Sequence, residues 1–443
     1  MIFLLGILGL VLGVVILVVG AYKGLGALPL TLFAGIVVVI SNDMYIWPAF
    51  AQAYMTGYVG FFMSFFLIFA FSALFAKIME ESGAALAVGY KFIDWFGAKR
   101  AVLIVFLTTA VLTYGGVSLF VVVFAISPII MILFSAADIP RRFAMGPLLA
   151  GAATFTMKSL PGSPQLTNVV PTNFLPTTLT AAPVLGIISA ILMFVLQVMY
   201  FNWEEKRLRA TGEGFTFIPG ANIEIYKVDR SQLPSAFTSF LPMVIVVGMI
   251  IGLRTVITVS AQLVVMSMIV ASAVALVLHW NRITSLKDII NTGSGGAISA
   301  IAAPAAVVGF GALVQSTPAF RIIVDALMGL DMNVYAMSAL APSILAGITG
   351  SSSGGLNISM QVLSEYYLTA IAAGLANAET LHRITAMFAG TLDTLPHSPG
   401  LFLMFGYLGI THREGYRFVW WGTVVIPTFV GMLMLGAVIF LGL

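Results

Sequence analysis

The chain has 443 residues, of which 60% are hydrophobic and 8% are charged, and its formal net charge is +3. This composition excludes a water-soluble globular protein and is typical of a polytopic membrane protein. The absence of cysteine excludes disulfides and cysteine-ligated iron–sulfur clusters. Because the basic residues form no aromatic-interleaved patch, we expect no nucleic-acid partner.

Apolar runs that could cross a hydrocarbon core, which takes roughly 20 residues per helix, follow one another along the chain. The predicted spans are 2–22, 27–40, 55–76, 143–176, 181–201, 236–253, 258–278, 294–316, 380–411 and 418–442. No basic residue precedes the first run and no small-residue cleavage site follows it. We therefore interpret 2–22 as a retained helix and not as a signal peptide.

Two further apolar segments, 101–135 and 336–374, are too long for one span and contain Gly-Gly pairs. Each is predicted to form a re-entrant hairpin. An amphipathic connector precedes each hairpin, at 78–99 and at 320–331, and such helices are expected to lie in the membrane interface. The predicted fold class is an all-α polytopic membrane protein with two re-entrant hairpins.

The distribution of Lys and Arg predicts the orientation in the membrane. If the N-terminus lies outside, most of the 20 basic residues face the cytoplasm, as the positive-inside rule requires. Arg254, Arg321 and Arg383 then lie outside and Lys158 lies within the membrane. Both termini face outward, and we expect a multi-pass protein of the bacterial inner (plasma) membrane.

Two similar motifs indicate an internal duplication. TMKSLPGSP at 156–164 matches TLDTLPHSP at 391–399, with an offset of 235 residues, and the Gly-Gly pair at 115–116 matches the pair at 354–355, with an offset of 239. In the predicted topology the two copies run in opposite directions, and such an inverted-topology repeat is typical of secondary transporters. The polar linker 202–235 joins the halves on the cytoplasmic side.

Each motif contains two prolines, which remove backbone donors and break a helix. A broken helix within a membrane is tolerated only where protein or a water-filled cavity satisfies its backbone. It offers an N-terminus that suits an anion and a C-terminus that suits a cation. We therefore predict a substrate site where the two discontinuous helices meet the hairpin tips. The candidate substrate-binding residues are Gly115, Gly116, Ser118, Lys158, Ser163, Gln165, Asn168, Ser352, Ser353, Gly354, Gly355, Asn357, Thr394 and Ser398.

Ionisable residues within the predicted spans are the candidates for ion or proton coupling. Lys158 and Asp393 occupy equivalent positions in the two motifs, and they either form a structural ion pair or take part in binding. His397 titrates near physiological pH and lies at a break, so it either carries a proton or caps freed carbonyls. Glu365, in the second hairpin, is a weaker candidate because a helix facing an outer aqueous vestibule would also explain it.

Three stretches carry a resemblance to a known family. They are TLDTLPHSPGLFLMFGYLGITHREGY at 391–416, LPGSPQLTNVVPTNF at 160–174 and GFGALVQSTPAF at 309–320. Over essentially its whole length, the chain resembles the gluconate and hydroxybutyrate permease family of GntP type, within the ion-transporter superfamily. The resemblance implies a proton-coupled importer of small hydroxy-carboxylates. It also implies a dimeric elevator, in which a transport domain moves against a scaffold.

The resemblance also implies a division into domains. Segments 1–79 and 236–317 would form the scaffold, 101–201 and 336–443 the transport domain, and 80–100 and 318–335 the arms between them, with 202–235 as the cytoplasmic linker.

Three functions remain open from the sequence: proton-coupled import of a small organic anion, sodium-coupled import of a carboxylate, and cation/proton antiport without an organic substrate. We expect no enzyme activity, because no nucleophile–base set or metal-ligand spacing occurs. No cofactor or metal is predicted. The expected partners are a small organic anion, protons or sodium, the lipid bilayer and a second copy of the chain.

Overall fold

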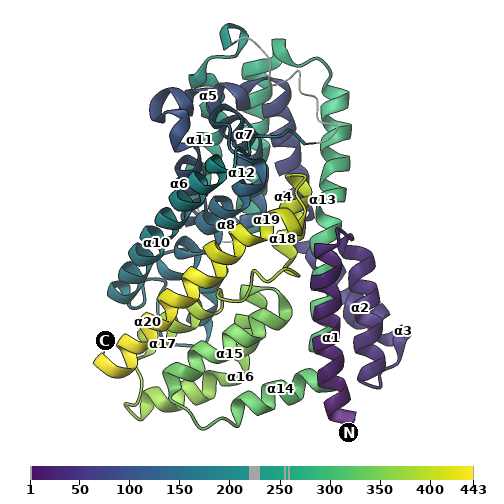
Figure 1. Cartoon of the computed structure of the whole chain (residues 1–443), viewed down its shortest axis with the longest axis vertical. Helices are drawn as coiled ribbons and strands as arrows, with labels where there is room; N and C mark the ends of the chain where they lie inside the picture. Colours follow the sequence, from purple (N-terminus) through teal and green to yellow (C-terminus); the bar gives the residue numbers. More distant parts are fainter. Residues whose placement is uncertain (1, 219–229, 254–255, 258–259, 443) are drawn as a thin grey trace.

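The computed structural model describes residues 2–218, 230–253, 256–257 and 260–442, and these residues form helices joined by turns, with no strand among them (Figure 1). The α-helices are α1 (Ile2–Tyr22), α2 (Ala27–Ser41), α3 (Ile46–Pro48), α4 (Met55–Glu81), α5 (Ala84–Phe96), α6 (Ala101–Tyr114), α7 (Leu119–Ala137), α8 (Met145–Ala153), α9 (Leu166–Val169), α10 (Pro183–Ala210), α11 (Ala236–Leu253), α12 (Ser260–His279), α13 (Leu286–Gln315), α14 (Pro318–Met328), α15 (Val334–Thr349), α16 (Ser352–Ala372), α17 (Ala378–Phe388), α18 (Pro399–Tyr407), α19 (His412–Val419) and α20 (Ile426–Leu441).

Within the described residues, eight helices are long and apolar enough to cross a membrane. The prediction of an all-α polytopic membrane protein is confirmed. Arg254, which the topology places outside, and the middle of the predicted linker, 219–229, lie outside the described residues.

Several helices are longer than the apolar runs that predicted them. The helix predicted at 55–76 is part of a continuous helical stretch, Ile46–Glu81, which includes a π-helical turn at Ala49–Tyr54. The helix predicted at 181–201 continues to Ala210 and takes up the start of the predicted linker. A run of apolar residues marks only the part of a helix that is soluble in hydrocarbon, whereas backbone hydrogen bonding continues through the polar ends.

The helices α4 and α13 pack along each other over much of their length. Gly57 and Gly309 allow this close approach. A Cβ on Gly57 would lie 2.8 Å from the carbonyl oxygen of Val308, and one on Gly309 would lie 2.9 Å from that of Tyr54. Figure 1 shows that α4 leads to α5 at the upper end of the molecule, whereas α13 leads to α14 at the lower end.

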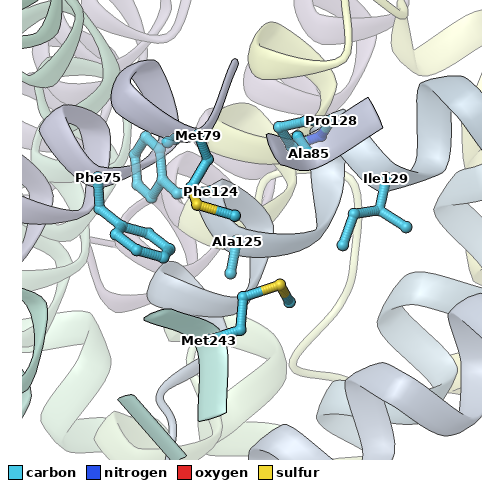
Figure 2. Close-up of a pocket in the computed structure, with 9 residues that line it drawn as sticks. Phe75, Met79, Ala85, Phe124, Ala125, Pro128, Ile129 and Met243 are labelled. Carbon is cyan, nitrogen blue, oxygen red and sulfur yellow. The ribbon is translucent and has the colours of Figure 1, made fainter. Parts of the chain in front are cut away.

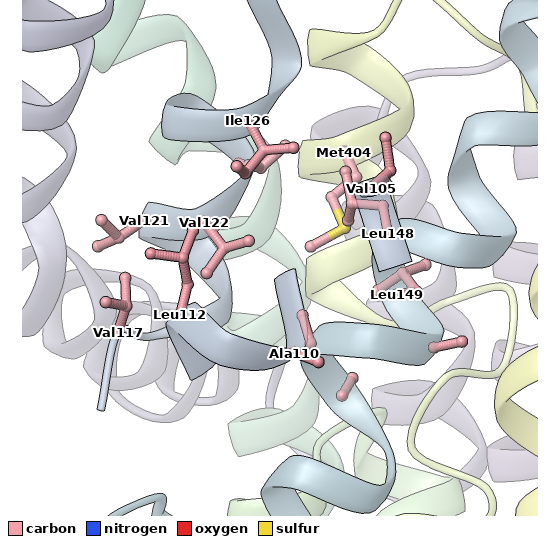
Figure 3. Packing of buried hydrophobic residues seen from close by; sticks show 14 of the residues in the cluster. Val105, Ala110, Leu112, Val117, Val121, Val122, Ile126, Leu148, Leu149 and Met404 are labelled. Atoms are coloured by element: carbon pink, nitrogen blue, oxygen red, sulfur yellow. The ribbon is translucent and has the colours of Figure 1, made fainter. Parts of the chain in front are cut away.

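The first hairpin is formed by α6 and α7, and it packs against α8 and against α18 from the second half of the chain. Figure 3 shows Val105 and Ala110 of α6 and Val121 of α7 in one apolar cluster with Leu148 of α8 and Met404 of α18. α5 joins α6 at an angle of 99°. The first half of α5 is buried against α7 and α11, so this connector is attached to the hairpin.

The C-terminal ends of the hairpin arms are separated by one offset in the two halves. α6 ends at Tyr114 and α15 at Thr349, and α7 ends at Ala137 and α16 at Ala372. Both pairs are 235 residues apart, the same offset as that of the two proline motifs. The alternative offset of 239, from the Gly-Gly pairs, does not match the helix ends.

The prediction that the Gly-Gly pair at 354–355 forms the tip of the second hairpin is therefore wrong. Gly350, in a left-handed conformation with φ of 65°, ends α15 and forms the turn. Gly354 and Gly355 lie in the first turn of α16. Gly355 instead allows the two arms of the hairpin to touch, because a Cβ there would lie 2.1 Å from the backbone nitrogen of Ala346.

We expect Gly355→Ala to destabilise the second hairpin and its neighbour Gly354→Ala to be tolerated. The added methyl group at 355 meets backbone, whereas the nearest atom to a methyl group at 354 is the Ser351 side chain, at 3.3 Å. Overpacking of this kind costs about 1–3 kcal/mol or more, and alanine is otherwise preferred over glycine within a helix. Thermal unfolding of the two purified variants in detergent measures the difference, and equal melting temperatures would contradict this account.

Candidate functional site

Both proline motifs interrupt the helices, as predicted. After α8, a π-helical turn at Phe155–Ser159 ends at Leu160, and α9 begins at Leu166. After α17, non-helical backbone extends from Ala389 to Ser398, and α18 begins at Pro399. We refer to 160–165 as the first break and to 389–398 as the second break.

A buried ion pair joins the first half to the second break. The Lys158 ammonium lies 3.2 Å from the Oδ1 atom of Asp393, and the two side chains are 1% and 8% exposed. The same ammonium donates a hydrogen bond of 2.5 Å to the carbonyl oxygen of Gly390. The side chain crosses the face of Gly390 so closely that a Cβ there would lie 1.8 Å from the lysine Cε atom. Lys158 therefore compensates both a carboxylate and a carbonyl that the second break leaves without a helical partner.

Arg383 is a buried cation that was not among the predicted site residues. It was predicted to lie on the outer side, and in the structure it is fully buried within the protein on α17. Its guanidinium donates hydrogen bonds to the Ala181 carbonyl oxygen (2.7 Å from Nη2), to the Asn168 Oδ1 atom (2.9 Å) and to the Lys158 carbonyl oxygen (3.4 Å). The signal that could have found it is its position inside the predicted span 380–411, since an ionisable residue within a membrane is a candidate functional residue.

The acceptors of Arg383 are all neutral. No carboxylate of the described residues lies within 4.0 Å of its guanidinium, and the nearby Glu379 is exposed and accepts a hydrogen bond from the Ala182 backbone. Lys158, Arg383 and Asp393 together contribute two positive charges and one negative charge. A buried charge without a counter-charge is costly, so this cluster favours the binding of an anion.

Asn168 uses its side chain entirely within the protein. Its amide nitrogen donates to the carbonyl oxygens of Ser163 and Leu179. Its oxygen accepts from Arg383 and from the His382 imidazole. In this structure Asn168 orients the two basic side chains of α17 and makes no bond toward an open space.

Each hairpin tip rests on the break of its own half. A Cβ on Gly116 would lie 3.2 Å from Pro164, and one on Gly350 would lie 3.2 Å from the His397 ring and 3.3 Å from Ser398. Gln165 holds the first tip, because its amide nitrogen donates to the carbonyl oxygens of Thr113 and Val117.

Several buried polar groups at these contacts have no hydrogen-bond partner. They are the hydroxyls of Ser118 and Ser163 and the two ring nitrogens of His397. The His397 ring faces the carbonyls of Gly347 and Ile348 at the end of α15 without reaching hydrogen-bond geometry. Since buried polar groups are normally satisfied, these atoms mark a place for a ligand or for water.

The remaining predicted residues divide into two groups. Ser352, Ser353 and Asn357 lie in the first two turns of α16, beside the second tip, and Thr394 in the second break shares a hydrogen bond of 2.6 Å with Thr423. Glu365 is exposed on α16, 13 residues beyond Ser352, or about 20 Å along the helix. The structure brings the first group to the breaks and leaves Glu365 away from them.

The Gly-x-Thr-His sequence at 409–412, which follows α18 in the stretch 391–416, has a structural role. Thr411 and Glu414 form a capping box that begins α19. His412 packs against Phe402 and Phe405 of α18, with ring centroids 4.8 and 4.5 Å apart. The motif therefore turns the chain and fixes α18 against α19.

Two hollows lie away from the breaks. Figure 2 shows the first, a space of about 10 Å³ lined by apolar side chains of α4, α5, α7 and α11, among them Phe75, Phe124 and Met243. The second is lined by aromatic and arginine side chains of α10, α19 and the π-helical turn Trp420–Val425. The described residues contain no group of three or more His, Asp or Glu that could hold a metal ion.

An all-helical chain with this set of membrane-crossing helices, two broken helices and a buried charge cluster has the character of a membrane transporter. No family model matches the sequence. The chain is 33% identical over 435 residues to the uncharacterized transporter YxjC of Bacillus subtilis, covering 90% of this chain and 91% of the relative. It is 22% identical over 370 residues to an uncharacterized transporter of Haemophilus influenzae, covering 82% and 83%. The protein therefore belongs to the transporter family of YxjC.

Proposed function

We propose that this protein is a secondary active transporter that imports a small organic anion by proton symport, with its substrate site at the two joined helix breaks. The observation that carries the proposal is the charge balance of the buried cluster. Lys158 and Arg383 outnumber Asp393 by one positive charge, so a bound monoanion, such as a small hydroxy-carboxylate, would neutralise the site. The resemblance to GntP-type permeases points to the same substrate class.

The hydroxyl groups at the breaks suit the rest of such a substrate. Ser118 and Ser163 have unpaired hydroxyls and can hydrogen-bond to the hydroxyl groups of a gluconate-like or hydroxybutyrate-like molecule. Lys158, Ser163 and His397 are buried, so a substrate reaches them only if a hairpin tip moves away from its break.

We propose further that the two halves form an inverted repeat and work as an elevator. The offset of 235 residues between the C-terminal ends of α6 and α15 and the placement of α5 and α14 at opposite ends of the molecule (Figure 1) support the inverted repeat. The scaffold would consist of 1–79 and 236–317, and the transport domain of 101–201 and 336–443. In this proposal the protein acts as a dimer in the bacterial inner membrane, with both termini outside.

Uptake into proteoliposomes tests the proposal. We expect labelled gluconate or 3-hydroxybutyrate to accumulate under an inward proton gradient and a protonophore to abolish the accumulation. An inward sodium gradient alone should have no effect. Sodium-driven uptake would instead assign the carbonyls that His397 faces to a cation site. Proton release driven by a cation gradient, with no carboxylate uptake, would identify an antiporter and overturn the proposal.

Asp393 is the proposed proton carrier because it is the one acidic member of the buried cluster. We expect Asp393→Asn to make uptake independent of the proton gradient while counterflow of substrate persists. Glu365→Gln is the matched control, since Glu365 is an acid of the same predicted transport domain but is exposed. Retained proton dependence in Asp393→Asn would move the coupling role to His397.

A further inference from the structure

The second hollow is a groove of about 620 Å³ lined by Tyr200, Trp203, Arg207, Arg417 and Trp421. These residues come from the end of α10, from α19 and from the π-helical turn after it, and α10 packs beside this turn and beside α20. The groove plays no part in the proposed transport site. It lies at the end of α10 that the distribution of basic residues predicts to be cytoplasmic.

The floor of the groove is positively charged. Glu204 is fully buried beneath it and accepts one arginine on each carboxylate oxygen, Arg207 at 2.9 Å and Arg417 at 2.8 Å. The two arginine side chains remain 41% and 40% exposed. One carboxylate for two guanidinium groups leaves an excess positive charge, and the two planar groups keep donors free for a bidentate acceptor such as a phosphate.

The walls of the groove are aromatic. Tyr200 stacks on Trp421, with ring centroids 6.1 Å apart, and the Arg207 guanidinium lies 5.8 Å from the centre of the Trp203 ring. Trp203 and Trp421 are exposed. Exposed tryptophans beside arginines at the end of a membrane-crossing helix are typical of the headgroup level of a bilayer.

An apolar stripe runs into the groove along α10. The exposed side chains are Val184, Ile188, Ile191, Val195 and Met199, and their spacing of three or four residues places them on one helix face that continues to Trp203. A ligand with a phosphate at the arginines would therefore have a hydrophobic surface for its tails. A free phosphate would not use this stripe.

We infer that this groove binds the headgroup of an anionic phospholipid, with the phosphate on Arg207 and Arg417 and the acyl chains along α10. Basic pockets between membrane helices at the cytoplasmic side commonly hold such headgroups. The charge and the adjoining apolar stripe favour a lipid over an acidic soluble partner.

Native mass spectrometry of the purified full chain with an equimolar mixture of dioleoyl phosphatidylglycerol and dioleoyl phosphatidylcholine tests the inference. We expect the wild type to retain phosphatidylglycerol preferentially. Arg207→Gln should lower the preference about fivefold, as expected for loss of one basic contact at the headgroup level. The fold should persist, because Arg417 still pairs with Glu204.

Arg209→Gln is the matched control. Arg209 lies on the same helix, is equally exposed at 41%, and pairs with Glu205 outside the groove, so its loss should leave the preference unchanged. An equal loss in both variants, or none in Arg207→Gln, would overturn the inference. Competition by glycerol 3-phosphate at the same concentration would show a site for free phosphate and would equally overturn the assignment to lipid.

Discussion

Replacing Lys158 by methionine is expected to abolish substrate uptake while the protein still inserts into the membrane. The change keeps the length of the side chain and removes the charge that pairs with Asp393 and caps Gly390. Breaking one side of a buried ion pair costs about 3–5 kcal/mol because the partner stays charged and unpaired. Uptake into proteoliposomes and the melting temperature in detergent measure the two effects separately.

A double variant distinguishes a structural ion pair from a substrate site. In Lys158→Met with Asp393→Leu no charge is left unpaired, so most of the lost stability should return. Uptake should not return, because the proposed anion contact and the proposed proton carrier are both absent. Full uptake by the double variant would assign the pair a structural role alone.

Arg383→Gln is expected to weaken anion binding strongly, because it removes the charge in excess within the buried cluster. Loss of a hydrogen bond to a charged group costs about 1.5–3 kcal/mol, or roughly 10- to 100-fold in affinity. Arg383→Lys keeps the charge and should retain part of the affinity, although one ammonium cannot reproduce the contacts to Ala181 and Asn168. Stabilisation of the purified protein by added carboxylate measures the binding.

Arg321→Gln serves as the control for that experiment. Arg321 was predicted to share the outer side with Arg383, but it is exposed on α14, so its loss should leave carboxylate binding unchanged. Undiminished binding by Arg383→Gln would show that the buried positive charge is balanced by something other than the substrate.

The parts of the site that depend on local chemistry could be predicted from the sequence. Both breaks were located from the proline pairs Pro161/Pro164 and Pro396/Pro399. Single prolines inside α7, α11, α13 and α15 leave those helices continuous. The offset of 235 residues placed Lys158 and Asp393 at equivalent positions, and the structure shows them in contact.

The parts of the site that depend on the alignment of the two halves or on packing could not be predicted from the sequence. Two glycines in a row can form a turn or allow two helices to touch, and only the structure shows that Gly355 does the latter. Arg383 was not among the predicted site residues because a charge bias over many residues concerns the orientation of a chain and not the contacts of one side chain. Its hydrogen-bond acceptors belong to Asn168 and Ala181, which lie more than 200 residues away in the sequence. No local sequence pattern predicts such contacts.

The ion pair between Lys158 and Asp393 also limits how the molecule can change shape. The lysine belongs to the first half of the chain and its two acceptors to the second. A rearrangement that slid one half past the other here would have to separate opposite charges away from water, at a cost of several kcal/mol. In the proposed elevator, displacement of both broken helices as a single rigid unit would leave that bond intact, and the flexible joints would then lie in the segments that connect this unit to α4 and α13.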